Sequence, residues 1–192
     1  MEEDEIKYRM LVIGGSAGSL DVILKIVSAL PVTDYLSVII IVHRKNDGES
    51  IFANLLSVRT NLIVREVEDK ETIKGGCIYI APADYHLLIE NKKMFSLDAS
   101  EKINYSRPSI DVTFESVAEV FKSSAIGILL SGANADGAKG LCEIKQAGGF
   151  TIVQDPESAD VAYMPQQALE QMKPDKILNG NDMAAFIKML FQ

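Results

Sequence analysis

The stretch RMLVIGGSAGSL, residues 9–20, joins an apolar run to a cluster of glycine, serine and alanine. The run Arg9–Ile13 predicts a buried strand, and the apolar spacing within Ser19–Leu30 predicts a helix. The small residues between them predict a tight turn, which places the Ser16 hydroxyl at the carboxyl edge of a sheet and near a helix start. Unpaired N–H groups at such a start favour developing negative charge. The turn Gly14–Gly18 fits the Gly-x-Ser-x-Gly pattern of nucleophilic serines, but a structural strand-to-helix turn has the same composition.

Buried strands alternate with helices along the rest of the chain. The near-continuous apolar runs Ser37–Val42 and Ser124–Leu130 are typical of parallel strands that helices cover on both faces. The segments His86–Ile89 and Met94–Leu97 predict an antiparallel hairpin. We therefore predict an α/β fold, a three-layer, doubly wound and mainly parallel sheet with helices on both faces and a short antiparallel extension. The other predicted elements are strands at Leu62–Val67, Cys77–Ala81 and Phe150–Val153, and helices at Ser50–Ser57 (with Ile51 and Leu55 facing inward, and Phe52 as a further candidate), from 107–109 onward, Ala138–Ala147, Pro165–Met172 and Met183–Phe191.

The length and charge of the chain limit its class. Its 192 residues, 47% apolar and 24% charged, are typical of one globular domain, here taken as residues 1–192. The net charge of −8 argues against nucleic-acid binding, which needs clustered lysine and arginine. The apolar run Val38–Val42 is too short to enter and cross a bilayer, and the acidic start Met1–Glu5 is no signal peptide. We expect no nucleic-acid partner and no membrane insertion.

The few histidines and cysteines limit the chemistry. Two histidines exclude a His-rich metal site, and Cys77 and Cys142 form no C-x-x-C pair. Free thiols are ordinary in a reducing compartment, so we expect a cytoplasmic protein. The glycine-rich turn lacks the Gly-x-Gly-x-x-Gly spacing of a dinucleotide site, and no Gly-Lys-Ser/Thr of a P-loop follows Gly18. We therefore expect neither a metal nor a cofactor.

Three polar residues occupy equivalent positions in the predicted sheet. Ser16, His43 and Asp136 each follow a buried strand at its carboxyl end. A serine that attacks an ester needs a base to take its proton and a carboxylate to orient that base, brought together in space. Histidine suits the base because its pKa lies near neutral pH. The order Ser, His, Asp differs from the Ser, Asp, His order of α/β-hydrolases, so that family is not supported.

Each of these residues also has a structural interpretation. Ser16 could cap the following helix, and His43 could be a core histidine at a strand end. Asp136 could be the N-cap of the helix Ala138–Ala147, a role that Asn134 could also fill. All three structural interpretations must hold at one sheet edge for the catalytic one to fail, and this favours catalysis.

The sequence resembles the catalytic domain of chemotaxis protein-glutamate methylesterases (CheB-type) over nearly its whole length. The segments that carry the resemblance are VIGGSAGSL (12–20), the strand that ends at His43, GCIYIAPADYH (76–86), RPSID (107–111), SGANADGAKG (131–140) and QDPESADVAYMPQQAL (154–169). The resemblance implies that Ser16 is the nucleophile, His43 the base and Asp136 its orienting acid. It also implies that His86 lines the pocket near the site.

The chain departs from the family pattern in one loop. Members commonly have Thr-Gly-Met-Gly where this chain has Ser131-Gly132-Ala133-Asn134. If the family methionine acts through its backbone amide, Ala133 keeps that oxyanion donor, and the amide of Ala17 is the second candidate donor. Asn134 replaces a glycine, which matters if this position needs a positive φ.

The resemblance implies a substrate and partners. It predicts a serine hydrolase that removes methyl groups from glutamate γ-methyl esters on the cytoplasmic helices of chemoreceptors, with deamidation of glutamines as a second activity. Many members carry an N-terminal receiver domain, but here the first strand begins within the first ten residues, so we expect a single catalytic domain with no receiver domain. The alternatives are then constitutive activity and control by a separate response-regulator or methyltransferase partner. The alternative is a catalytically weak binding or signalling module that keeps the fold.

Overall fold

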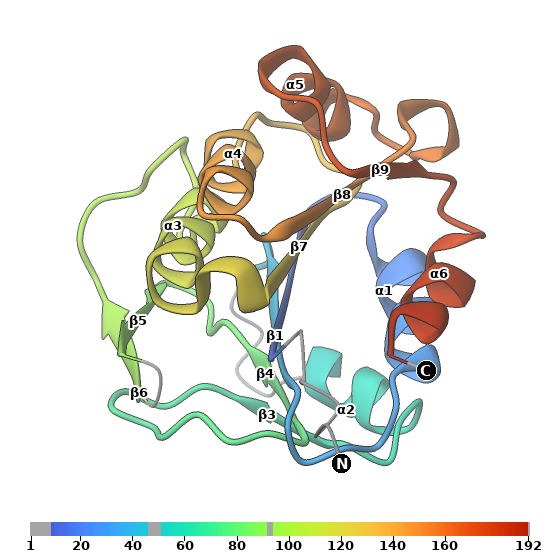
Figure 1. Ribbon diagram of the computed structural model, residues 1–192. Coiled ribbons are helices and arrows are strands. Elements are labelled where there is room, and N and C mark those ends of the chain that lie inside the picture. The colour runs from blue at the N-terminus through green and yellow to red at the C-terminus, as the bar shows by residue number, and fades with distance from the viewer. Residues whose placement is uncertain (1–8, 46–50, 92–93, 192) are drawn as a thin grey trace.

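The computed structural model describes residues 9–45, 51–91 and 94–191. Its main sheet has seven parallel strands in the order β3-β4-β2-β1-β7-β8-β9 (Figure 1). The central strand β1 (Met10–Gly15) pairs with β2 (Ser37–Val42) on one side and with β7 (Ala125–Leu129) on the other. The outer strands are β3 (Ile63–Glu66), β4 (Cys77–Ile80), β8 (Phe150–Gln154) and β9 (Lys176–Leu178). The strands that follow β1 in sequence lie first on its β2 side and then, from β7 onward, on its other side. The strand order therefore reverses between β1 and β7, and ligand sites of such sheets lie at this switch point.

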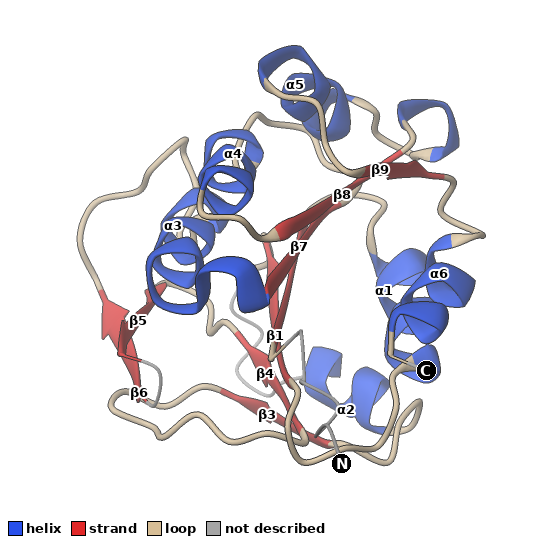
Figure 2. Ribbon diagram, viewed as in Figure 1, coloured by secondary structure: helices blue, strands red, loops and turns tan. Residues whose placement is uncertain are grey.

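Helices cover both faces of the sheet, as Figure 2 shows. One layer contains α1 (Leu20–Ala29), α2 (Ile51–Ser57) and α6 (Met183–Leu190), and the other contains α3 (Ile110–Phe121), α4 (Ala138–Gln146) and α5 (Tyr163–Gln171). Alternate residues of β1 serve the two layers: Met10 and Val12 pack in the α3 layer, and Leu11 and Ile13 pack in the α1 layer. Short 3-10 helices lie at Lys122–Ser124 and Pro156–Ser158.

An antiparallel pair, β5 (His86–Asn91) and β6 (Met94–Asp98), forms a separate sheet beside α3 (Figure 1). Its Leu87 and Phe95 side chains join the core under α3, and the Thr113 hydroxyl of α3 donates to the Leu87 carbonyl at 2.8 Å. The parallel sheet, its two helical layers and this pair confirm the predicted α/β fold class.

The structure corrects two details of the predicted elements. In α2 the residues Phe52 and Leu56 are buried, whereas Ile51 and Leu55 are exposed, so the predicted inward positions of Ile51 and Leu55 were wrong and only the further candidate Phe52 faces the core. Both pairs have the same four-residue spacing, and the spacing alone does not distinguish them. The predicted first residue of this helix, Ser50, lies outside the described residues. The short strand β9 was not predicted, because three residues carry too little pattern.

No helix in the described ranges has the length and apolar character to cross a bilayer.

Candidate active site

The three predicted catalytic residues emerge at one edge of the sheet. Ser16 follows β1, His43 follows β2, and Asp136 lies in the loop after β7. Backbone hydrogen bonds continue the sheet into these loops, from the His43 N–H to the Gly15 carbonyl (3.3 Å) and from the Ser16 N–H to the Ser131 carbonyl (2.9 Å). The ends of three neighbouring strands therefore hold the backbones of Ser16 and His43 side by side, with the Asp136 loop adjoining them.

The His43 ring contacts the Asp136 carboxylate directly. His43 Nε2 lies 2.7 Å from Asp136 Oδ2, and the His43 side chain is 14% exposed while that of Asp136 is fully buried. With Nε2 engaged by the carboxylate, Nδ1 is the ring nitrogen left to exchange a proton with another group. The carboxylate therefore fixes the orientation of the imidazole ring, which is the geometry that a general base requires.

Asp136 is held by the start of α3. Its Oδ2 accepts from the Ile110 N–H (2.7 Å), and its Oδ1 accepts from the Asp111 N–H (3.0 Å) and the Ser109 hydroxyl (2.9 Å). Burial by itself raises the pKa of Asp136, but the hydrogen bonds from His43 and from these two amides outweigh it and hold the pKa below its ordinary value. The carboxylate is therefore ionised at neutral pH, opposite the positive end of a helix dipole.

His86 is buried and contacts Ser109, a member of this hydrogen-bond network. Its ring is 1% exposed, its Nδ1 accepts from the Ser109 N–H at 3.1 Å, and its Nε2 lies 2.8 Å from the Glu101 carbonyl. Because Nδ1 accepts and a carbonyl can only accept, the ring is neutral with its proton on Nε2. The structure places His86 in the protein interior. Ser109 links it to Asp136, because the Ser109 N–H donates to His86 and the Ser109 hydroxyl donates to Asp136.

Asp111 is a part of the site that the sequence did not single out. From α3, its Oδ1 accepts from the N–H groups of Gly137 (3.0 Å) and Gly140 (2.7 Å), and its Oδ2 accepts from Asn104 Nδ2 (3.0 Å). The N-cap residue of α4 is Gly137, which has no side chain, so Asp111 caps α4 from a neighbouring helix. Asp136 is therefore not the N-cap of α4. Asp111 fixes the loop that carries Asp136.

The Asp111 carboxyl gives a testable dependence of stability on pH. Burial raises its pKa to about 6, and the Asp136 charge acts in the same direction. A carboxyl with a raised folded-state pKa adds stability that is present below its unfolded pKa and is lost as pH rises through about 6. We expect the free energy of unfolding to fall by up to about 3 kcal/mol between roughly pH 4 and pH 7 from this group.

Chemical denaturation across this pH range checks the prediction. The Asp111→Asn variant should lack this part of the slope, since asparagine keeps an oxygen for Gly137 and Gly140 but has no titrating group. A variant with the same pH slope as the parent protein would contradict the assignment.

Ser16 is partly exposed. Its hydroxyl makes no hydrogen bond to any residue in the described ranges. The N-cap of α1 is Ser19, whose own hydroxyl donates to the Ser16 carbonyl at 2.7 Å, so Ser16 does not cap this helix. Gly132 lies against Ser16, because a Cβ at this glycine would stand 3.0 Å from the Ser16 Cβ.

The other predicted pocket residues are Ala17, which follows Ser16, and Ala133 and Asn134 in the loop after β7. Within the described residues, the N–H groups of Ala17 and Ala133 have no protein acceptor, as an oxyanion donor requires. Asn134 is not among the residues with positive φ, so glycine is not needed there. Its Oδ1 accepts from the Asp136 N–H (3.1 Å) and its Nδ2 donates to the Ser106 hydroxyl (3.2 Å). Asn134 thus braces the Asp136 loop.

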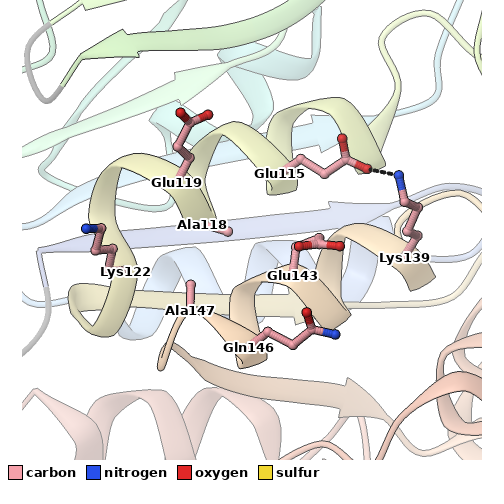
Figure 3. Close-up of a pocket in the computed structure, with 8 residues that line it drawn as sticks. All are labelled: Glu115, Ala118, Glu119, Lys122, Lys139, Glu143, Gln146 and Ala147. Carbon is pink, nitrogen blue, oxygen red and sulfur yellow. Dashed lines mark hydrogen bonds and ion pairs between the residues drawn. The ribbon is translucent and has the colours of Figure 1, made fainter.

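Of two cavities in the structure, one includes a predicted catalytic residue in its lining and the other includes none. A cleft of about 410 Å³ has His43 in its wall. A larger groove of about 620 Å³ lies between α3 and α4, where Figure 3 shows Glu115 paired with Lys139 across it. None of the predicted site residues lines the larger groove, so size alone does not identify the site. Among the described residues, no group of His, Cys, Asp and Glu is arranged to hold a metal ion.

Comparison with known proteins gives one consistent family. Residues 11–187 match the family model described as CheB methylesterase. A Leptospira interrogans protein with the provisional name of protein-glutamate methylesterase/protein-glutamine glutaminase is 42% identical over 187 residues, 96% of each chain. A Thermotoga maritima protein of the same name is 35% identical over 90% of this chain, which spans 51% of that protein. The crystal structure of the Thermotoga maritima CheB methylesterase catalytic domain has a TM-score of 0.88 and 34% identity, and the match covers 95% of this chain and 98% of that one.

Proposed function

The chain belongs to the CheB methylesterase family, and on this premise we propose that it hydrolyses glutamate γ-methyl esters on the cytoplasmic helices of chemoreceptors by a Ser-His-Asp mechanism. The observation that carries the mechanism is the 2.7 Å contact between His43 and a buried, ionised Asp136, at the sheet edge where Ser16 emerges. The names of the relatives, which give a methylesterase and a glutaminase, support the substrate class and add glutamine deamidation as a second activity.

The proposed reaction has two halves. Ser16 Oγ attacks the ester carbonyl while His43 Nδ1 takes the hydroxyl proton, and the imidazolium that forms is stabilised by Asp136. The N–H groups of Ala17 and Ala133 hold the oxyanion. The intermediate then collapses, His43 protonates the departing methoxide, and methanol leaves an acyl-enzyme.

Water completes the cycle. It attacks the acyl carbonyl as His43 takes one of its protons, and this proton returns to Ser16 Oγ when the C–O bond to the enzyme breaks. The product is a glutamate carboxylate. The same steps with ammonia as the leaving group convert a glutamine side chain to glutamate.

Methanol release from a methylated cytoplasmic receptor fragment tests the substrate. We expect the protein to release methanol from the fragment, and to release ammonia from the same fragment with glutamine at the modified positions. A fragment that keeps all its methyl groups with folded protein would contradict the proposal.

A fluorophosphonate reagent tests the nucleophile separately from the substrate. We expect it to modify Ser16, because an oriented base activates the hydroxyl, and we expect His43→Ala to reduce the labelling rate by about 10²-fold or more. Mass spectrometry of the labelled peptide identifies the modified residue. Labelling of another serine, or labelling that His43→Ala leaves unchanged, would rule out the proposed roles.

A further inference from the structure

The cleft beside His43 concentrates positive charge in a protein of net charge −8. Among the residues that line its 410 Å³ are Lys45, Lys102 and Arg107. Arg44 also lines it, but a 2.7 Å ion pair with Glu66 balances the Arg44 charge. Asp84 also lines the cleft, but the cations outnumber it, so the local charge is positive on balance and opposite in sign to that of the whole molecule. A cleft with an excess of one sign of charge attracts ions of the other sign.

Three of these cations differ from Arg44 in how they are held by the described residues. No ion pair of Lys45, Lys102 or Arg107 occurs within the described parts of the chain. Arg107 is held instead by neutral groups, since its Nη1 donates to the carbonyls of Ala99 (2.9 Å) and Ser100 (2.8 Å). These bonds fix the guanidinium without cancelling its charge. A fixed, unpaired guanidinium next to two free ammonium groups favours an anion in the cleft.

An exposed aromatic residue stands in the same wall. Tyr105 is 97% exposed and lines the cleft, on a tight turn in which Ile103 and Ser106 exchange two backbone hydrogen bonds. Both central residues of this turn have positive φ, 50° at Asn104 and 62° at Tyr105. This conformation is unusual for an aromatic residue and is found where the surrounding structure enforces it. Asn104 Nδ2 donates to Asp111 Oδ2 at 3.0 Å, which anchors the turn to the network around Asp136.

We propose that this cleft binds a side-chain carboxylate of the substrate helix next to the methyl ester that Ser16 attacks. The inference rests on the proposed function. The reaction itself converts a neutral ester into a carboxylate, so a neighbouring position that has already been hydrolysed presents the anion that Lys45, Lys102 and Arg107 attract. Tyr105 packs against the apolar part of the same helix. The enzyme therefore works faster on an ester whose neighbours are free glutamates than on one whose neighbours are neutral.

Two synthetic helical peptides test this inference. Each carries one glutamyl γ-methyl ester, and the positions one helical turn away on either side are glutamate in one peptide and glutamine in the other. The readout is the ratio of kcat/KM for methanol release from the two peptides. At low ionic strength we expect the glutamate peptide to react about fivefold better, mainly through KM, because exposed ion pairs each contribute a modest amount. The preference should shrink in about 0.5 M salt, which screens exposed charges.

The variant Lys45→Gln/Lys102→Gln isolates the cleft. Neither lysine side chain makes a hydrogen bond or ion pair to a described residue, so their replacement should leave the melting temperature unchanged. We expect the ratio to fall close to one. The matched control is Lys188→Gln, which removes an exposed lysine of α6 in the opposite helical layer and should keep the full preference.

The possible outcomes separate the two proposals. Equal rates on the two peptides, or a preference that survives in the double variant, overturn the carboxylate site alone. No methanol from either peptide overturns the proposed function and this inference with it.

Discussion

Replacement of Ser16 with alanine is expected to reduce methanol release by about 10⁴-fold or more, because no other group supplies the attacking oxygen. The folded state should be nearly unaffected. The Ser16 hydroxyl donates to no described residue, and α1 is capped by Ser19 through the Ser16 carbonyl, which alanine retains. Initial rates of methanol release, measured beside a thermal melt of the same preparation, check both parts of the prediction.

A second serine provides the control. Ser28 lies exposed on α1 and donates to the Leu24 carbonyl, away from the site. The Ser28→Ala variant should keep the full rate. If the Ser16→Ala variant retained a comparable rate while melting normally, Ser16 would not be the nucleophile.

Replacement of Asp136 with asparagine is expected to lower kcat by about 10⁴-fold, since an amide no longer stabilises the imidazolium or selects the ring tautomer. This variant should also be less stable. All four groups around the carboxylate are donors: His43, Ser109 and the N–H groups of Ile110 and Asp111. Asparagine has one oxygen, so in either orientation its NH₂ group must face the backbone N–H of Ile110 or of Asp111, which can only donate. We expect a loss of about 1–3 kcal/mol in the free energy of unfolding.

Urea denaturation and single-turnover kinetics measure these two effects. Asp182→Asn is the matched control, because Asp182 is exposed at the start of α6 and its side chain does not cap that helix. Full activity of Asp136→Asn would remove Asp136 from the mechanism. Reduced activity with unchanged stability would instead contradict the hydrogen-bond network described for this carboxylate.

The fold could be predicted because buried parallel strands leave continuous apolar runs. β2 reads SVIIIV and is buried over almost its whole length, and its neighbour β1 is buried throughout. The position of Ser16, His43 and Asp136 at one edge followed from their places at strand ends. Their catalytic roles stay a prediction, and so does the single-domain organisation of the chain.

Other features could not be predicted for physical reasons. In α2, two apolar stripes with the same spacing compete, and only packing against the sheet selects Phe52 and Leu56. The sequence does not show that Asp111 caps α4. An aspartate in the first turn of a helix is common, and its partners Gly137 and Gly140 belong to the start of a different helix. Likewise, the sequence does not show that His86 faces Ser109, since that contact depends on how β5 packs beside α3.

The position of β1 between β2 and β7 has a consequence for the order in which the protein folds. The pairing of β1 with β2 joins Met10 to Ser37, a short closure, whereas the pairing with β7 joins Met10 to Ala125. Longer closures cost more chain entropy and form more slowly. Ser16 and His43 can therefore meet early in refolding, but Asp136 reaches them only after the long closure. The regain of esterase activity would then report on this late step, while the bulk of the secondary structure returns before it.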